Sequence, residues 1–166
     1  MEIFEAIKSR RAVKNYDPTA SVSEEDFNQL MSAVILSPTS YNIQHWRFVR
    51  AKDKALREKL KEAAWGQIQI VEASELLILC ADVKAWSDRP ERYWADAAED
   101  RKAMLIPMID SFYASKDQVQ RDEAMRSCGI AAQTLMLAAK AMGYDTCPMI
   151  GFDAEAVAKL INLPEH

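Results

Sequence analysis

Residues 123–142 read EAMRSCGIAAQTLMLAAKAM and are followed directly by Gly143. Apolar side chains recur along this segment at the spacing of one helical face, at Met125, Cys128, Ala132, Leu135, Ala139 and Met142. Other apolar residues fill the remaining faces, so we expect a helix that is buried at the centre of the core. Gly143 is a typical stop signal for such a helix.

Three segments around this helix predict strands. Residues 46–51 are rich in tryptophan, phenylalanine and valine, which favour strands. Residues 76–81 read LLILCA, a short continuous apolar run that favours a strand buried on both faces. Residues 144–149 are a third candidate strand.

Helices are predicted on either side of these strands. The second helix is opened by the N-cap residue Ser23, and the last is capped by Asp153. Because helices outnumber strands, we expect one three-layer α+β domain over residues 1–166. The expected helices cover residues 1–10, the segment between Ser23 and Ser37, residues 54–64, residues 92–114 with a start or kink at Pro107, residues 123–142, and the segment from Asp153 to Leu160.

Composition and charge exclude several classes of protein. Lys and Arg number 21 against 25 Asp and Glu, and the net charge of −4 argues against nucleic-acid binding. The 4 glycines form no GxGxxG or Walker A motif, so neither a Rossmann dinucleotide domain nor a P-loop domain is expected. The 3 cysteines form no CxxC motif, and with only 2 histidines the chain predicts neither a disulfide scaffold nor a metal site.

The sequence carries no membrane or export signal. No apolar run reaches the roughly 18 residues that a membrane span needs, and the first residues contain no secretory apolar segment. We therefore expect no membrane partner and a cytoplasmic location.

Four stretches carry residues suited to binding. The first reads SRRAVK at residues 9–14 and places the cations Arg10, Arg11 and Lys14 close together. Arginine binds phosphate oxygens through two parallel hydrogen bonds, and lysine adds a point charge. Cations near the end of a helix also complement its dipole, and this alternative stays open at this point.

The second and third stretches are rich in hydrogen-bonding side chains. Residues 37–46 read SPTSYNIQHW and could line a polar ligand cleft, or form a turn in which side chains bond to the backbone. Residues 65–69 read WGQIQ, and their two amides could face the edge of a heterocycle or remain surface glutamines.

The fourth stretch reads CPMIGFD at residues 147–153. A predicted strand ends there, Gly151 permits a close backbone approach, and the N-terminus of a helix follows. The same features also fit an ordinary connection between a strand and a helix.

In order and spacing, these four stretches resemble the nitroreductase family of FMN-dependent oxidoreductases. The resemblance extends from Met1 to about Pro164, and its most specific parts are the second and fourth stretches. It implies a central mixed, mostly antiparallel sheet surrounded by helices. It also implies an intertwined homodimer with two FMN sites at the interface.

The resemblance implies roles for residues of all four stretches. Arg10 and Arg11 would hold the FMN phosphate and ribityl chain, and Lys14 would sit at the pyrimidine edge of the flavin. Further contacts would come from amides at the same ring edge, from backbone near N5, and from residues that reach the flavin of the partner subunit. They are, in that order, Gln67 and Gln69; Pro148, Ile150 and Gly151; and Pro38, Thr39, Ser40 and Asn42.

The implied activity is a two-step, ping-pong reaction. NAD(P)H would pass a hydride to flavin N5, and a nitroaromatic, a quinone or a similar flat aromatic acceptor would then take electrons at the same place. Because the flavin carries this chemistry, no catalytic acid or base is expected from the protein. The alternatives are a related FMN enzyme for a specific biosynthetic or halogenated substrate, and a non-catalytic flavin-binding or truncated relative.

The sequence departs from the family in two places. Family members usually continue past the position of His166 with another strand and a basic pair, so we expect this C-terminal segment to be absent. His45 stands where a proline is frequent. The charged segment 88–100, which contains Tyr93 and Trp94, is interpreted as a solvated helix or flap without assigned chemistry.

Overall fold

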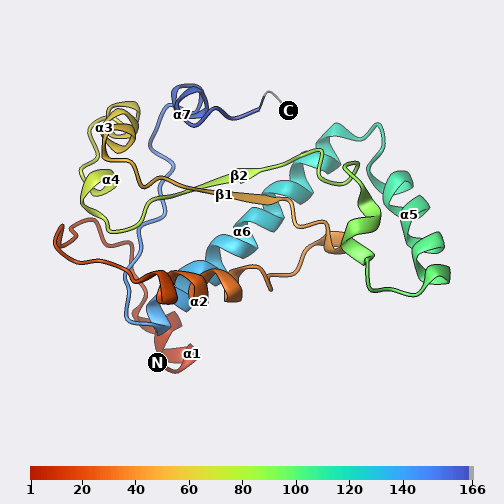
Figure 1. Cartoon of the computed structure of the whole chain (residues 1–166), viewed down its shortest axis with the longest axis horizontal. Helices are drawn as coiled ribbons and strands as arrows, with labels where there is room; N and C mark the ends of the chain where they lie inside the picture. The colour runs from red at the N-terminus through yellow and green to blue at the C-terminus, as the bar shows by residue number, and fades with distance from the viewer. Residues whose placement is uncertain (165–166) are drawn as a thin grey trace.

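The computed structural model describes residues 1–164, and Figure 1 shows helices arranged around a pair of strands. The elements are α1 (Ile3–Ser9), α2 (Glu24–Val34), η1 (Ser40–Asn42), β1 (Trp46–Arg50), α3 (Lys54–Ala63), α4 (Gln69–Glu72), β2 (Leu77–Ala81), η2 (Pro90–Trp94), α5 (Glu99–Tyr113), α6 (Asp117–Ala141) and α7 (Ala154–Leu160).

The long helix α6 occupies the centre, as the sequence predicts. It contacts both strands and the helices α1, α2 and α5. It begins at residue 117 rather than 123, because residues 117–122 are polar apart from Val119 and form helical turns that an apolar pattern does not reveal. Gly143 follows its end with a φ of 94°, the left-handed conformation that glycine adopts readily.

The sheet among the described residues consists of β1 and β2, paired antiparallel with Trp46 opposite Ala81 and Arg50 opposite Leu77. The prediction of a third strand over residues 144–149 is wrong. This segment forms a single parallel bridge, between Thr146 and Ala12. Pro148 has no N–H to donate, so the segment cannot form a continuous ladder with a neighbour.

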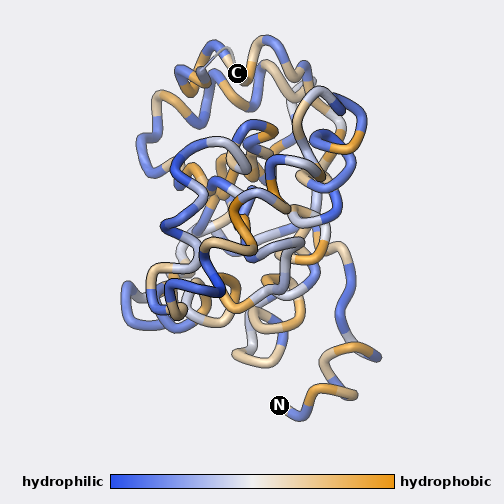
Figure 2. Tube along the Cα trace, turned by 90° about the vertical axis from the view of Figure 1, so that its right-hand side faces the viewer, coloured by the Kyte–Doolittle hydropathy of each residue, from blue (hydrophilic) through white to orange (hydrophobic). Residues whose placement is uncertain are grey.

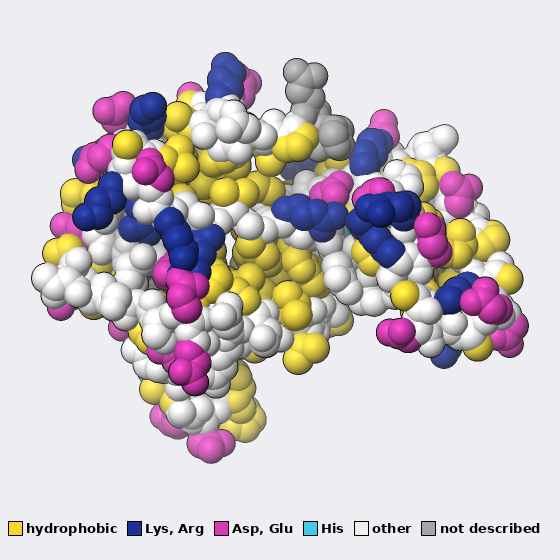
Figure 3. Space-filling view, viewed as in Figure 1, with side chains coloured by type: hydrophobic (Ala, Val, Ile, Leu, Met, Phe, Trp, Pro, Cys, Tyr) yellow, Lys and Arg dark blue, Asp and Glu magenta, His cyan; other side chains and the backbone are white. Residues whose placement is uncertain are grey.

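β2 is less buried than its apolar sequence predicts. All five of its residues are half-buried rather than buried on both faces. The reason is an apolar groove of about 610 Å³ beside the strand, lined by Phe48, Leu79, Leu135 and Met149 among others. Figure 3 shows apolar side chains gathered in the hollow near the middle of the molecule.

Two groups of elements lie at opposite ends of the sheet (Figure 1). α3, α4 and α7 gather at the end where β1 finishes, and Asp53 and Asp153 accept hydrogen bonds from the first turns of α3 and α7. η2 and α5 lie at the end where β1 begins. The helix expected over 92–114 is therefore two elements, and Pro107 lies inside the second one.

α1 lies within the helix predicted over residues 1–10, and its apolar face is not covered. Ile3, Phe4 and Ile7 are all exposed, Phe4 at 73%, while Ala6 is buried against the molecule. Figure 2 shows this helix standing out from the body with its apolar residues in orange. No helix within residues 1–164 combines the length and the apolar character needed to cross a bilayer.

Candidate functional site

The cations of the first stretch lie on an exposed segment just after α1. Arg10 is the C-cap residue of that helix, and Arg11 donates to the carbonyl oxygens of Lys8 and Arg10 at 2.9 and 2.8 Å. Arg11 therefore complements the helix end, as the alternative interpretation expects. None of Arg10, Arg11 and Lys14 forms an ion pair with a carboxylate of residues 1–164. Their charge remains available to an anion.

The fourth stretch lies directly beside these cations. The backbone N–H of Val13 donates to the carbonyl oxygen of Thr146 at 3.1 Å, next to the bridge between Ala12 and Thr146. This contact joins segments more than a hundred residues apart in sequence. It places Lys14 and its neighbours next to the backbone that leads into Pro148.

The amides of the third stretch reach the fourth stretch as well. Gln67 donates from Nε2 to the carbonyl oxygen of Gly151 at 2.6 Å, and Gln69 donates from Nε2 to Oε1 of Gln67 at 2.9 Å. Gln69 is buried, so it holds Gln67 in place rather than facing solvent. The first and third stretches therefore both contact the segment 146–151, the first at Thr146 through Val13 and the third at Gly151 through Gln67. We call this set, Arg10, Arg11, Lys14, Gln67 and Gly151, the cation–amide cluster.

The packing around Gly151 is tight. A Cβ atom at this position would lie 3.1 Å from Nε2 of Gln67 and 3.5 Å from Cζ3 of Trp65. The expected close approach to Gly151 is thus made here by a side chain of the chain itself. The adjacent Ile150 is 96% exposed, so an apolar surface lies directly beside the hydrogen-bonded amide.

Trp65 is a candidate site residue that the sequence interpretation missed. Its side chain is 73% exposed beside Gly151, and its backbone has a φ of 56°, which is uncommon for a bulky residue. Gly66 follows with a φ of 80°. The Trp-Gly pair at the end of the α3 helix was the available signal, because a helix often ends in left-handed residues.

The second stretch lies elsewhere in the chain. Its last residues lead into β1, which runs for five residues, roughly 16 Å, before the chain reaches α3 and the amides. Figure 1 shows η1 beside η2, at the opposite end of the sheet from α3 and α4. The structure therefore does not bring Pro38, Thr39, Ser40 and Asn42 to the cation–amide cluster within one chain.

Residues 38–45, which we call the 38–45 loop, have a strained backbone. Tyr41, Asn42 and Gln44 have φ values of 50°, 57° and 54°, in the left-handed region that non-glycine residues rarely adopt. Oγ1 of Thr39 accepts a hydrogen bond from the backbone N–H of Gln44 at 3.0 Å. Such clusters of strained residues persist where the surroundings hold them, typically at functional sites.

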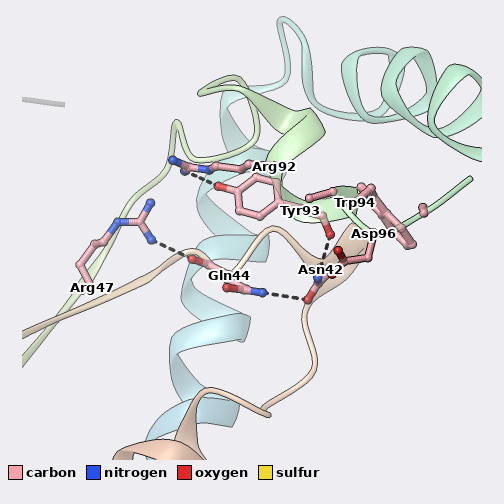
Figure 4. Close-up of a pocket in the computed structure, with 9 residues that line it drawn as sticks. Asn42, Gln44, Arg47, Arg92, Tyr93, Trp94 and Asp96 are labelled. Atoms are coloured by element: carbon pink, nitrogen blue, oxygen red, sulfur yellow. Dashed lines mark hydrogen bonds between the residues drawn. The ribbon is translucent and has the colours of Figure 1, made fainter. Parts of the chain in front are cut away.

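A cavity of about 650 Å³ adjoins this loop (Figure 4). Nε2 of Gln44 donates to Oδ1 of Asn42 at 3.1 Å, and Nδ2 of Asn42 donates to the carbonyl oxygen of Tyr93 at 3.0 Å. The segment 88–100, to which the sequence interpretation assigned no chemistry, thus forms one wall of a cavity. The lining residues are Asn42, Gln44, Arg47, Arg92, Tyr93, Trp94, Ala95, Asp96 and Ala97.

The two arginines of this cavity are both balanced by carboxylates. Arg47 pairs with Asp82 at 2.7 Å, and Arg92 pairs with Asp88 at 2.8 Å. Asp96 adds a third negative charge to the cavity wall. This cavity therefore differs from the cation–amide cluster, whose cations have no such partners, and it suits a neutral polar ligand better than an anion.

His45, at the end of the loop, is completely buried. Its Nδ1 lies 3.1 Å from Oγ of Ser127, and burial lowers the pKa of the imidazole to about 4. The ring is therefore neutral near pH 7. No group of three or more potential metal-ligating side chains occurs in the described part of the chain.

Comparisons with known proteins identify relatives of this chain. The model of the Nitroreductase family matches residues 7–166. Protein DrgA of Synechocystis sp. is 50% identical over 164 residues, which are 99% of this chain and 78% of that protein. A protein of Bacillus subtilis, MhqN, is 35% identical over 176 residues, covering 99% of this chain and 83% of its own length.

Solved structures agree in fold. The crystal structure of YdfN from Bacillus subtilis has a TM-score of 0.91 at 34% identity, covering 98% of this chain and 81% of that one. A structure from Exiguobacterium sibiricum, solved in complex with FMN, has a TM-score of 0.91 at 26% identity, covering 99% and 82%. The expected fold is thereby confirmed, and the chain belongs to the Nitroreductase family.

Proposed function

We propose that this chain is an FMN-dependent oxidoreductase that uses NAD(P)H to reduce nitroaromatics, quinones or similar flat acceptors. The observation that carries the proposal is that two sequence-distant stretches, one with the cations and one with the amides, both contact the segment 146–151. The FMN-bound relative from Exiguobacterium sibiricum and the match to the Nitroreductase family support the choice of cofactor.

The chemistry of the cluster fits the parts of FMN. Cations without carboxylate partners suit its phosphate, because charge-assisted hydrogen bonds from arginine to phosphate are strong. The amide of Gln67 offers both a donor and an acceptor, as the polar edge of the flavin ring requires. Trp65 and Ile150 present exposed apolar surface that the rest of the ring would cover. The amide and the apolar surface lie around Gly151, and the cations follow α1 near Thr146, at the other end of the segment 146–151.

The side chains then take the following proposed roles. Arg10 and Arg11 hold the phosphate and ribityl chain, and Lys14 places positive charge at the polar ring edge. Gln67 is oriented toward that edge by buried Gln69. Pro148, Ile150 and Gly151 supply the backbone beside the ring. The bound flavin would supply the redox chemistry by accepting a hydride from NAD(P)H and passing electrons to the acceptor in a second half-reaction.

We further propose that residues 1–166 form one domain and that two copies complete each site. The 38–45 loop lies too far along the sheet to reach the cluster of its own chain, so Pro38, Thr39, Ser40 and Asn42 would contact the flavin held by a second copy. The uncovered apolar face of α1 supports pairing of copies, because contiguous exposed apolar surface typically marks an interface. The cytoplasmic location stays a prediction.

The cavity beside Asn42 is the proposed place of the acceptor, because Asn42 belongs to both the cavity and the proposed flavin contacts. Its far wall comes from residues 92–97, so this segment would select the acceptor. This observation also favours the alternative, a related enzyme with a narrower substrate, since a change in the segment would change what the cavity admits.

The test begins with the purified chain and FMN. We expect added FMN to bind, with a shift in its visible absorption and quenching of its fluorescence, and NADPH to bleach the bound flavin under anaerobic conditions. A chain that binds no FMN overturns the proposal. A chain that binds FMN but is not reduced by NADH or NADPH within minutes supports the non-catalytic alternative instead.

A matched pair of lysine variants tests the cluster itself. Lys14→Gln should slow flavin reduction by roughly ten-fold, because it removes one charge-assisted contact worth about 1.5 kcal/mol. Lys8→Gln removes an equally exposed cation that pairs only with Glu5 and should leave reduction unchanged. Equal effects of the two substitutions would show that overall charge, not the cluster, matters.

A further inference from the structure

The 38–45 loop ends at His45, whose side chain is the most deeply buried polar group of the loop. The ring is 0% exposed, and Nδ1 lies 3.1 Å from Oγ of Ser127 on α6. The carbonyl oxygen of His45 accepts from the backbone N–H of Asp82 at 2.8 Å. His45 is thus fixed by side chain and backbone, at the point where the strained loop becomes β1.

The loop needs such external attachments, because its conformation is unfavourable on its own. Three left-handed residues within four positions each cost about 1 kcal/mol, and local hydrogen bonds offset only part of this. Three side chains tie the segment to other elements: Ser37 to Thr134 at 3.0 Å, Asn42 to Tyr93 at 3.0 Å, and His45 to Ser127. Of these, the pair formed by His45 and Ser127 is the one buried on both sides.

We propose that His45 is a positioning residue, which holds the 38–45 loop in its strained conformation through Ser127 and so presents Ser40 and Asn42 to the cofactor. This inference rests on the proposed function for the identity of the cofactor. The geometry of the loop is independent of the proposed function, because it is observed in the chain itself.

The surroundings of the ring make this attachment depend on protonation. The charged and titratable groups that face it are Glu123 of α6, Asp82 after β2, Arg47 of β1 and the Tyr113 phenol of α5. The removal of the ring from water outweighs the attraction of the two carboxylates, so the pKa falls to about 4. Nε2 has no hydrogen-bond partner in the described structure. A protonated ring would carry an N–H at both nitrogens, and the N–H at Nε2 would have no acceptor in the described interior.

Amide hydrogen exchange tests the loop without any cofactor. With a pKa of about 4 when the ring is buried and 6.5 when it is free, protonation should favour loop opening by roughly 30-fold more at pH 5.0 than at pH 7.5. Loop amides should lose that much protection after correction for intrinsic exchange, while amides of α3 should not. An equal loss in both regions would overturn the proposal, because it would mean that His45 supports only global stability.

His45→Asn is the matched variant for this measurement. The asparagine amide can keep the bond to Ser127 but does not titrate, so the loop should lose its pH-dependent protection change. His45→Leu fills the space without a hydrogen bond and should expose the loop at both pH values. A loop that keeps the same pH dependence in His45→Asn contradicts the assignment.

FMN affinity tests the positioning role. At pH 7.5, His45→Leu and Ser127→Ala should each weaken FMN binding by about ten-fold, while His45→Asn should stay within about three-fold of the original chain. Thermal unfolding must show that every variant is folded at the assay temperature. Unchanged FMN affinity in both His45→Leu and Ser127→Ala overturns the inference. If the original chain binds no FMN, the proposed function fails, and the exchange measurement still decides whether His45 holds the loop.

Discussion

The cation–amide cluster and the 38–45 loop lie at the two ends of one short sheet and are built in opposite ways. The cluster takes its residues from three distant stretches, which are linked by backbone and amide hydrogen bonds. Arg11 and Lys14 are exposed, Arg10 is half-buried, and none of the three pairs with a carboxylate of residues 1–164. The loop is one contiguous segment with a strained backbone, and buried side chains attach it to α6. One region offers charge to a ligand, and the other offers a fixed shape.

The separation of these regions has a simple physical consequence. A strand cannot shorten, so β1 keeps the loop roughly 16 Å from the end of the sheet where the amides lie. In our proposal, a ligand that uses both regions therefore lies between two copies of the chain. In the proposed homodimer, a cluster from one copy supplies the anion and ring-edge contacts, and a loop from the other completes the site.

The largest expected effect tests how the 38–45 loop is held by His45. The buried His45 has a pKa of about 4 in the folded chain, lower than its unfolded value of 6.5, so the unfolded chain binds the extra proton first as the pH falls. The associated stability is fully present above pH 6.5 and is lost progressively toward pH 4. We expect urea unfolding to report a loss of about 3 kcal/mol over this window. In His45→Asn the same measurement should give a much flatter profile.

The second effect tests whether the cation–amide cluster binds FMN. Arg10→Gln combined with Arg11→Gln should weaken FMN binding by about 100-fold, because two charge-assisted hydrogen bonds are lost. The midpoint of thermal unfolding should fall only slightly, since neither arginine pairs with a carboxylate in residues 1–164 and the hydrogen bonds of Arg11 to the end of α1 are exposed. The single change Arg121→Gln removes an exposed cation on α6 and is the control. Binding that is insensitive to the double change would place the phosphate elsewhere.

A pair of glycine variants sharpens the geometry of the cluster. Gly151→Ala places a Cβ 3.1 Å from Nε2 of Gln67, so the amide must move, and FMN affinity should fall by about ten-fold. Gly129→Ala meets no atom within 4 Å and lies inside α6, where alanine is favoured by about 1 kcal/mol. It should raise the unfolding midpoint and leave FMN binding as it was. A neutral Gly151→Ala would mean that the contact of Gln67 with Gly151 is dispensable.

The smallest effect concerns the internal support of the loop. Thr39→Val removes the acceptor for the backbone N–H of Gln44 and should cost about 1 kcal/mol of stability, measured by urea unfolding. Thr39→Ser keeps the oxygen and should restore most of that loss. If both variants behave alike, the hydroxyl does not hold the left-handed Gln44.

Several elements could be predicted because their signals are local. Ser23 accepts a hydrogen bond from the N–H of Asp26, and Asp153 caps α7, both as the sequence indicates. The failures are non-local in origin. Residues 144–149 have the composition of a strand but form a single bridge, and β2 is half-buried because a groove lies beside it. The local sequence of a segment predicts neither the strand that pairs with it nor a groove beside it, because both depend on distant parts of the chain.

The candidate site likewise has features that the local sequence predicts and features that depend on tertiary packing. The types of residue in its four stretches, cations, amides and a glycine beside a helix start, follow from chemistry that each segment carries alone. The sequence cannot determine that Gln69 is buried behind Gln67, or that Trp65 lies against Gly151, because both depend on how α4 and the 147–153 segment pack. The left-handed backbone of Tyr41 and Gln44 likewise depends on surrounding contacts that hold it.

By itself, then, the sequence determined most of the helices, the caps Ser23 and Asp153, the central apolar helix, and the resemblance to a family through the order of four short stretches. Those features depend on neighbours within a few turns of the chain, where spacing alone fixes contacts. Only the tertiary structure decided that three stretches are joined by hydrogen bonds while the fourth lies at the far end of β1. The reason is that the extended strand β1 separates the 38–45 loop from the amides in space, and this distance cannot be read from the number of residues between them.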